Sequence, residues 1–177
     1  MNMTTNSDQI TESECNFDVS IYTKSALKLD MRIQFQGKTP EEVFEIMGDP
    51  ERITDWYLLA KKVLLHPPND DGQVDFDVEF AMFGLVREEI LHWEMPLRYV
   101  YSAKGKDFPI KDYIALIEIR QMGEDKGELI WQQYFDHIEG EHNKRLLPVI
   151  LPPINEQSLN CLAEMIGGTS VTLKSYM

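Results

Sequence analysis

The stretch TPEEVFEIMGDPERITDWYLLAKKV, residues 39–63, contains two helix starts in close succession. Thr39 can cap the first helix with its hydroxyl, and Pro40 follows at the first helical position, where a backbone N–H is not needed. Gly48 favours a helix end, and the pair Asp49-Pro50 then repeats the same start. Two helices this short are not stable alone in water. The stretch therefore predicts two small helices that pack against a larger element.

The segments on both sides of this stretch alternate between apolar and polar residues, which indicates strands with one buried face. The alternation is strict over residues 26–36. Further strands are expected at residues 61–65, 73–82, 85–93, 98–103, 111–120 and 128–137. Short links between such segments are typical of a curved antiparallel sheet. We expect about seven strands, with the two small helices between the first and the second.

The last part of the chain changes from strand to helix periodicity. Residues 145–154 are apolar but contain three prolines, which argue against a single regular helix there. A helix is expected to begin at Pro153 or Asn155 and to end at the pair Gly167-Gly168, because glycine favours helix ends. The sequence thus predicts an α+β domain with one C-terminal helix.

The polar first segment and the last residues are interpreted as tails. Residues 1–17 are rich in Ser, Thr, Asn and acidic residues and are expected to be mobile. Residues 169–177 are interpreted as a short C-terminal tail. Residues 18–168 then form a single ligand-binding domain, since 177 residues are enough for one sizeable core.

The net charge of −13 makes nucleic acids and anionic membranes poor candidates for partners. No apolar run reaches the roughly 20 residues that a membrane span needs, and the N-terminus has no signal-peptide pattern. The two cysteines do not form a disulfide framework. These features predict a cytoplasmic protein, and a homodimer is compatible with them.

The order of these elements resembles the START-related, pollen-allergen-like superfamily known as SRPBCC. The resemblance covers roughly residues 26–167. It rests on a family-like pattern in the helix pair, matched by Pro40, Val43, Phe44, Asp49, Pro50 and Trp56, and on the segment HWEMPLRYVY around residues 93–101. It implies a helix-grip fold, in which the sheet wraps the C-terminal helix and a cavity lies between them. Members of the superfamily bind apolar or aromatic small molecules, and a minority are polyketide cyclases or dehydrases.

Metal, nucleophile and cofactor motifs are not evident in the sequence. The four histidines do not form an HExxH motif, and Glu88 and His92 lie four residues apart on an expected strand, where they span roughly 13 Å. Neither a Gly-x-Ser-x-Gly motif nor a phosphate-binding glycine loop occurs. The sequence therefore predicts no metal and no cofactor, and it assigns no catalytic residue.

The hairpin formed by residues 73–93 has two alternative registers. A two-residue turn at Phe83-Gly84 would place Arg87 and Glu89 on the inner face, opposite Phe80 and Val78. A buried charge is costly unless it is paired, so Arg87 and Glu89 would form a polar anchor for a ligand. A slipped register, produced for example by a bulge, would instead turn Val86, Ile90 and His92 inward.

Aromatic residues are frequent around the expected cavity. Core packing can explain each of them singly, but together they favour a gap of ligand size beneath a helix that brings only Leu, Ala and Met. The candidate ligand-binding residues are Arg87, Glu89, Phe76, Phe80, Trp93, Tyr101, Tyr113, Trp131, Leu162 and Met165.

The sequence supports three functional hypotheses. The first is the binding or transport of a hydrophobic or aromatic small molecule in an internal cavity. The second is a polyketide cyclase- or dehydratase-type enzyme that uses polar residues in the cavity. The third is a protein-interaction module with a filled core.

Overall fold

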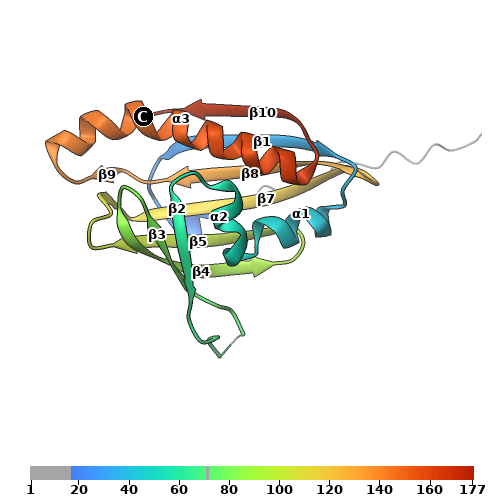
Figure 1. Cartoon of the computed structure of the whole chain (residues 1–177), viewed down its shortest axis with the longest axis horizontal. Coiled ribbons are helices and arrows are strands. Elements are labelled where there is room, and N and C mark those ends of the chain that lie inside the picture. The colour runs from blue at the N-terminus through green and yellow to red at the C-terminus, as the bar shows by residue number, and fades with distance from the viewer. Residues whose placement is uncertain (1–16, 71) are drawn as a thin grey trace, which may run out of the picture.

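The computed structural model describes residues 17–70 and 72–177. Its main feature is an antiparallel sheet of eight strands in the order β10-β1-β8-β7-β5-β4-β3-β2, with helix α3 lying along it (Figure 1). The eight strands are β1 Leu27–Gln36, β2 Ala60–Leu65, β3 Phe76–Phe80, β4 Gly84–Glu94, β5 Arg98–Gly105, β7 Tyr113–Gly123, β8 Lys126–Tyr134 and β10 Gly168–Ser175. Two short strands, β6 Ile110–Lys111 and β9 His137–Ile138, pair separately.

The remaining elements are helical. They are η1 Val19–Ile21, α1 Pro40–Met47, η2 Pro50–Arg52, α2 Ile53–Trp56 and α3 Glu141–Ile166. The α+β helix-grip architecture predicted from the sequence is therefore confirmed, including the two small helices between β1 and β2. None of the helices in the described ranges is long and apolar enough to cross a membrane.

The helix pair forms as its capping residues predict. The Thr39 hydroxyl accepts a hydrogen bond from the Glu42 amide at 3.3 Å, and the Glu42 carboxylate accepts one from the Thr39 amide at 2.8 Å. These two bonds form a capping box. Asp49 caps the second start by accepting from the Glu51 amide at 3.0 Å. The Tyr99 hydroxyl on β5 donates to the Met47 carbonyl at 2.9 Å, which fixes the end of α1 to the sheet.

Burial of the aromatic residues in the helix pair is also confirmed, since Phe44 is 1% exposed and Trp56 is 5% exposed. Trp56 packs edge-on against Trp131 of β8, with ring centroids 5.7 Å apart. We expect Trp56→Ala to lower the free energy of unfolding by about 3 kcal/mol, as large-to-small core substitutions do. Urea unfolding would measure the loss, and a loss below about 1 kcal/mol would contradict a packing role for this side chain.

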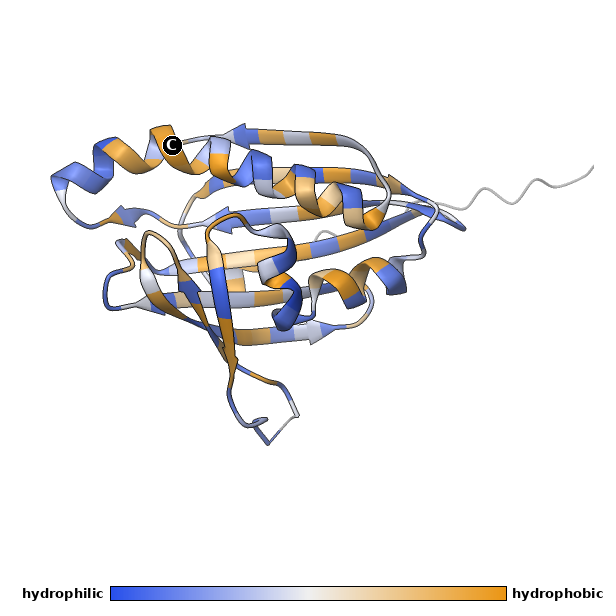
Figure 2. Ribbon diagram, viewed as in Figure 1, coloured by the Kyte–Doolittle hydropathy of each residue, from blue (hydrophilic) through white to orange (hydrophobic). Residues whose placement is uncertain are grey.

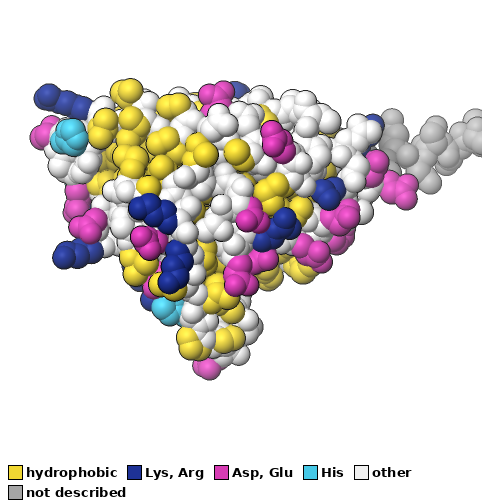
Figure 3. Space-filling view, in the orientation of Figure 1, with side chains coloured by type: hydrophobic (Ala, Val, Ile, Leu, Met, Phe, Trp, Pro, Cys, Tyr) yellow, Lys and Arg dark blue, Asp and Glu magenta, His cyan; other side chains and the backbone are white. Residues whose placement is uncertain are grey.

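The C-terminal helix is longer than the sequence indicated. It begins at Glu141 rather than near residue 153, and it includes Pro148, Pro152 and Pro153. Each proline lacks a helix hydrogen bond, but Leu147 and Leu151 are 1% and 4% exposed, so their burial offsets part of this loss. Hydrophobic side chains also gather on the outer surface of the first half of α3 (Figure 3).

The tail predicted for residues 169–177 is wrong, because Gly168–Ser175 forms strand β10 and pairs with β1. Strand β10 accounts for the eighth strand of the main sheet. Val171 and Leu173 are partly buried against the core. Strand β10 carries both hydrophobic and hydrophilic residues (Figure 2). The predicted N-terminal tail falls on residues 1–16, outside the described ranges, and on Phe17, which packs with Val19 and Tyr22 against Val100.

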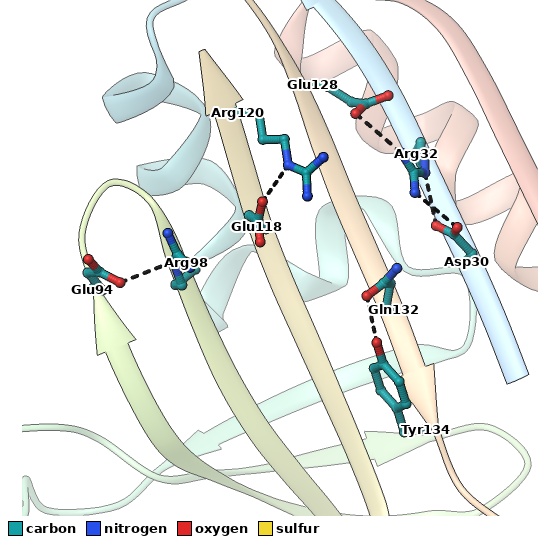
Figure 4. A network of polar contacts seen from close by, with 9 residues as sticks. All are labelled: Asp30, Arg32, Glu94, Arg98, Glu118, Arg120, Glu128, Gln132 and Tyr134. Atoms are coloured by element: carbon teal, nitrogen blue, oxygen red, sulfur yellow. Dashed lines mark hydrogen bonds and ion pairs between the residues drawn. The ribbon is translucent and has the colours of Figure 1, made fainter. Parts of the chain in front are cut away.

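The two faces of the sheet differ in chemistry. The inner face, covered by the helices, carries the main hydrophobic core. The outer face carries ion pairs and hydrogen bonds between neighbouring polar side chains (Figure 4). Examples are Arg32 with Asp30 at 3.0 Å and Arg98 with Glu94 at 3.0 Å. Several charged residues on the strands therefore have partners on the outer face, whereas a charged residue that points inward enters the apolar side of the molecule.

Candidate functional site

A cavity of about 600 Å³ lies between the inner face of the sheet and the helices. Its floor comes from β3, β4, β5, β7 and β8, and Leu151 and Asn155 of α3 contribute to the opposite wall. The exposed residue Gly72, in the loop between β2 and β3, also lines it, so the cavity reaches the surface beside this loop. A volume of this size falls within the range of about 300–1,000 Å³ that is typical of small-molecule sites.

The register of the hairpin between β3 and β4 decides which polar groups enter the cavity. Phe80 pairs with Gly84, so the loop is Ala81 to Phe83, three residues long, and not the two-residue turn predicted at Phe83-Gly84. Gly84 has φ +64, a left-handed conformation that glycine adopts easily and that is typical of such loops. Relative to the predicted pairing, each residue of β3 therefore faces a β4 residue three positions earlier.

Arg87 and Glu89 consequently lie on the outer face, and their predicted role as a cavity anchor is wrong. Arg87 is hydrogen-bonded to Asp77 and Glu89 pairs with Lys104 at 2.6 Å. The hydrogen bond from Arg87 is the main cause of the lowered pKa of Asp77.

The alternative register that the sequence allowed is correct in part, because Val86 and Ile90 line the cavity. His92 does not point inward, since a bulge between Ile90 and His92 shifts the strand, and its ring lies 5.1 Å from that of Phe17. The same bulge turns Trp93 into the cavity wall.

Glu88 enters the cavity between Val86 and Ile90, and it is 8% exposed. Its direct neighbours across the strands are Phe76 on β3 and Ala103 on β5. Burial in these apolar surroundings raises the pKa of the Glu88 carboxyl to about 8, because the charged form loses its hydration. Among the described residues that line the cavity, Glu88 is the only Asp, Glu, Lys, Arg or His.

Aromatic rings form much of the cavity wall. Tyr99, Tyr101 and Tyr113 follow one another across β5 and β7, with ring centroids 6.0 and 6.2 Å apart. Burial raises the pKa of all three phenols, so these tyrosines are neutral at physiological pH. Trp56 and Trp131 complete the wall next to the helix pair.

Some polar groups near the helices are hydrogen-bonded within the protein, and others have no partner. The Tyr57 hydroxyl donates to the Asn155 side-chain oxygen at 3.1 Å, and the Leu58 amide donates to the Ser158 hydroxyl at 3.1 Å, so these bonds connect the segment between α2 and β2 to α3. The indole N–H groups of Trp56 and Trp131 are buried without a hydrogen-bond partner. A buried donor without a partner is uncommon in proteins, so these two groups are available to an acceptor.

Six of the ten candidate residues from the sequence line the cavity, namely Phe76, Phe80, Trp93, Tyr101, Tyr113 and Trp131. Leu162 and Met165 do not line it, although Leu162 is fully buried and Met165 packs against the core. The reason is the early start of α3, which places Leu151 and Asn155 over the cavity and leaves later turns to fill the core. Sequence reasoning missed Glu88, although alternation with Val86 and Ile90 could have indicated it.

Metal binding finds no support in the described part of the chain. No group of three His, Cys, Asp or Glu side chains there is arranged to hold a metal ion. The one cysteine in the described ranges, Cys161, is free.

Comparisons with known proteins agree on the fold. No protein-family model and no curated protein sequence matches this chain. A START superfamily protein from Mycobacterium smegmatis is similar in structure, with a TM-score of 0.63, 13% identity, and coverage of 80% of this chain and 97% of that one. A conserved protein from Geobacillus kaustophilus has a TM-score of 0.62, 15% identity, and coverage of 83% and 99%.

Norcoclaurine synthase from Thalictrum flavum, in complex with dopamine and hydroxybenzaldehyde, is also similar, with a TM-score of 0.58, 12% identity, and coverage of 94% of this chain and 96% of that one. These likenesses confirm the SRPBCC resemblance at the level of the fold. The chain has the helix-grip fold of START-related proteins, with a cavity in the place that this fold implies.

Proposed function

We propose that the protein binds or transports a hydrophobic or aromatic small molecule in the cavity between the sheet and α3. The observation that carries this proposal is the cavity of about 600 Å³ with an aromatic wall. Apolar cavities that do not fill with side chains accept apolar guests. The same observation disfavours a protein-interaction module with a filled core.

One structural neighbour binds aromatic molecules in the same fold. The norcoclaurine synthase structure holds dopamine and hydroxybenzaldehyde, which are both small aromatic molecules. Fold similarity alone does not transfer a ligand, so the proposal for this chain rests on its own tyrosines and tryptophans.

A second candidate function is proton-transfer catalysis of the cyclase or dehydratase type. It is favoured by Glu88, because a carboxyl with a pKa of about 8 can donate or accept a proton near neutral pH. The Arg87–Glu89 pair has no part in this hypothesis, since both side chains lie on the outer face.

Binding can be tested with the neutral fluorescent probe N-phenyl-1-naphthylamine and a variant that fills the cavity. Ala103 lies on the cavity floor, so Ala103→Phe should reduce probe affinity by about tenfold or more, since a phenyl group would occupy the space of the guest. Fluorescence titration would measure the dissociation constant, and melting curves would confirm folding.

Ser102→Phe provides the matched control. Ser102 pairs with Glu89 on the outer face, so the substitution adds the same ring outside the cavity. This variant should bind the probe as the wild type does. Equal affinities for the wild type and for folded Ala103→Phe would contradict binding in the cavity.

A further inference from the structure

The carboxyl of Glu88 differs from every other buried carboxyl in the described part of the chain. Four acidic side chains are buried there, namely Asp30, Asp77, Glu88 and Glu118. The other three are each bound to an arginine on the outer face: Asp30 to Arg32, Asp77 to Arg87 and Glu118 to Arg120. The Glu88 carboxyl has no hydrogen bond or ion pair with any described residue.

An unpaired buried carboxyl is costly, because it loses its hydration and gains nothing in exchange. Leu or Met at this position would fill the site between Phe76 and Ala103 without this penalty. A carboxyl that keeps no protein partner and faces a cavity is therefore available to a ligand that can donate a hydrogen bond or carry a positive charge.

The surroundings of Glu88 favour a cation over a neutral donor. The ionisable groups in electrostatic contact with it are the phenols of Tyr57, Tyr99, Tyr101 and Tyr113, which come from the end of α2, β5 and β7. No Lys, Arg or His occurs among the described lining residues, so no fixed positive charge competes for the carboxylate. Aromatic ring faces attract cations, and the net charge of −13 favours their approach.

We propose that the ligand of this cavity carries a protonated amine on an apolar or aromatic body, and that Glu88 binds the amine. This inference rests on the proposed function, because it assigns the chemical class of the molecule that enters the same cavity. The aromatic wall holds the body, and Glu88 accepts hydrogen bonds from the ammonium group. The unpartnered indole N–H groups of Trp56 and Trp131 can bind an oxygen atom elsewhere on the ligand.

The amine is tested with three indoles that share one ring system and differ in the end group: tryptamine, tryptophol and indole-3-acetate. Isothermal titration calorimetry of the full chain at pH 8.5 should show tryptamine binding about tenfold or more tighter than tryptophol, since charge-assisted hydrogen bonds are stronger than neutral ones. Indole-3-acetate should bind weakest, because its carboxylate meets that of Glu88.

Glu88→Gln should remove the preference for tryptamine over tryptophol. Glu89→Gln is the matched control, because the neighbouring carboxyl lies on the outer face with Lys104 and should leave the preference unchanged. Since burial raises the pKa of Glu88 to about 8, tryptamine affinity should rise more than tenfold from pH 6 to pH 8.5 in the wild type and stay level in Glu88→Gln.

The outcomes separate this inference from the proposed function. Equal binding of tryptamine and tryptophol, or a preference that survives in Glu88→Gln, would overturn the assignment of the amine. Binding of none of the three indoles would overturn it as well. In each of these cases the cavity-filling experiment with N-phenyl-1-naphthylamine still decides whether the cavity binds apolar molecules at all.

Discussion

Glu88→Gln is expected to stabilise the protein by roughly 4 kcal/mol at pH 8.5 and to change its stability little at pH 5. The pKa of Glu88 is about 8 in the folded protein, against a value of 4.5 for the free side chain. Between these values the folded state binds more protons than the unfolded state. The stability of the wild type therefore falls as the pH rises from about 4.5 to about 8, by about 1.4 kcal/mol per unit at most.

Glutamine has nearly the same shape as the protonated acid and does not ionise, so the variant should not share this decline. Urea unfolding of both proteins between pH 5 and pH 9 would measure the difference. Glu89→Gln should change stability by less than about 1 kcal/mol, because it disturbs only a pair with a largely exposed lysine. Parallel stability profiles for the wild type and Glu88→Gln would show that Glu88 ionises as an ordinary surface acid does.

The loss of stability on ionisation of Glu88 also bears on ligand binding. A ligand that binds only the folded state raises its stability by mass action. An amine that pairs with Glu88 would therefore recover at pH 8.5 part of the stability that the isolated carboxylate removes. Residues kept in a destabilising state are frequently functional, and Glu88 fits this pattern.

The fold could be predicted because its determinants are local. Thr39 and Asp49 cap their helices through side-chain bonds to amides two or three residues away, and the pattern of these bonds is readable from sequence. Strict alternation over β1 predicts a strand with one buried face, and Met31 and Ile33 are indeed fully buried. Neither inference requires knowledge of distant residues.

The site could be predicted only in part because it depends on register and on tertiary contacts. One extra residue in the loop from Ala81 to Phe83 decides that Glu88, and not Glu89, enters the cavity. The aromatic lining was predictable since it depends on composition, and six of its members were found. The prolines of α3 indicated a broken helix, but burial of Leu147 and Leu151 outweighs that local preference.

Strand β10 also could not be predicted from its local sequence. Gly167 and Gly168 correctly predicted the end of α3, but the residues after them lack a strong hydrophobic pattern. Residues 168–175 form a strand because β1 offers them an unpaired edge. Such an edge is a property of the folded sheet, and a local sequence pattern does not reveal it.

Gly167→Val is expected to lower the free energy of unfolding by about 4 kcal/mol, of which backbone strain and overpacking contribute about 2 kcal/mol each. Gly167 ends α3 with φ +74, a conformation that β-branched residues rarely adopt. An added Cβ atom would lie 2.4 Å from the Gln36 carbonyl oxygen. The Gln36 amide donates to the Gly167 carbonyl at 2.9 Å, so the contact that joins α3 to the end of β1 would have to move.

Gly37→Val is the matched control, because Gly37 has φ +84 and an added Cβ would meet no atom within 4 Å. This variant should lose only the strain contribution of about 2 kcal/mol. Urea unfolding of both variants would measure the difference, and equal losses would contradict a role for the close approach to Gln36. Because Leu151 and Asn155 of α3 line the cavity, a shift of the helix in Gly167→Val should also weaken binding of N-phenyl-1-naphthylamine, whereas Gly37→Val should leave it unchanged.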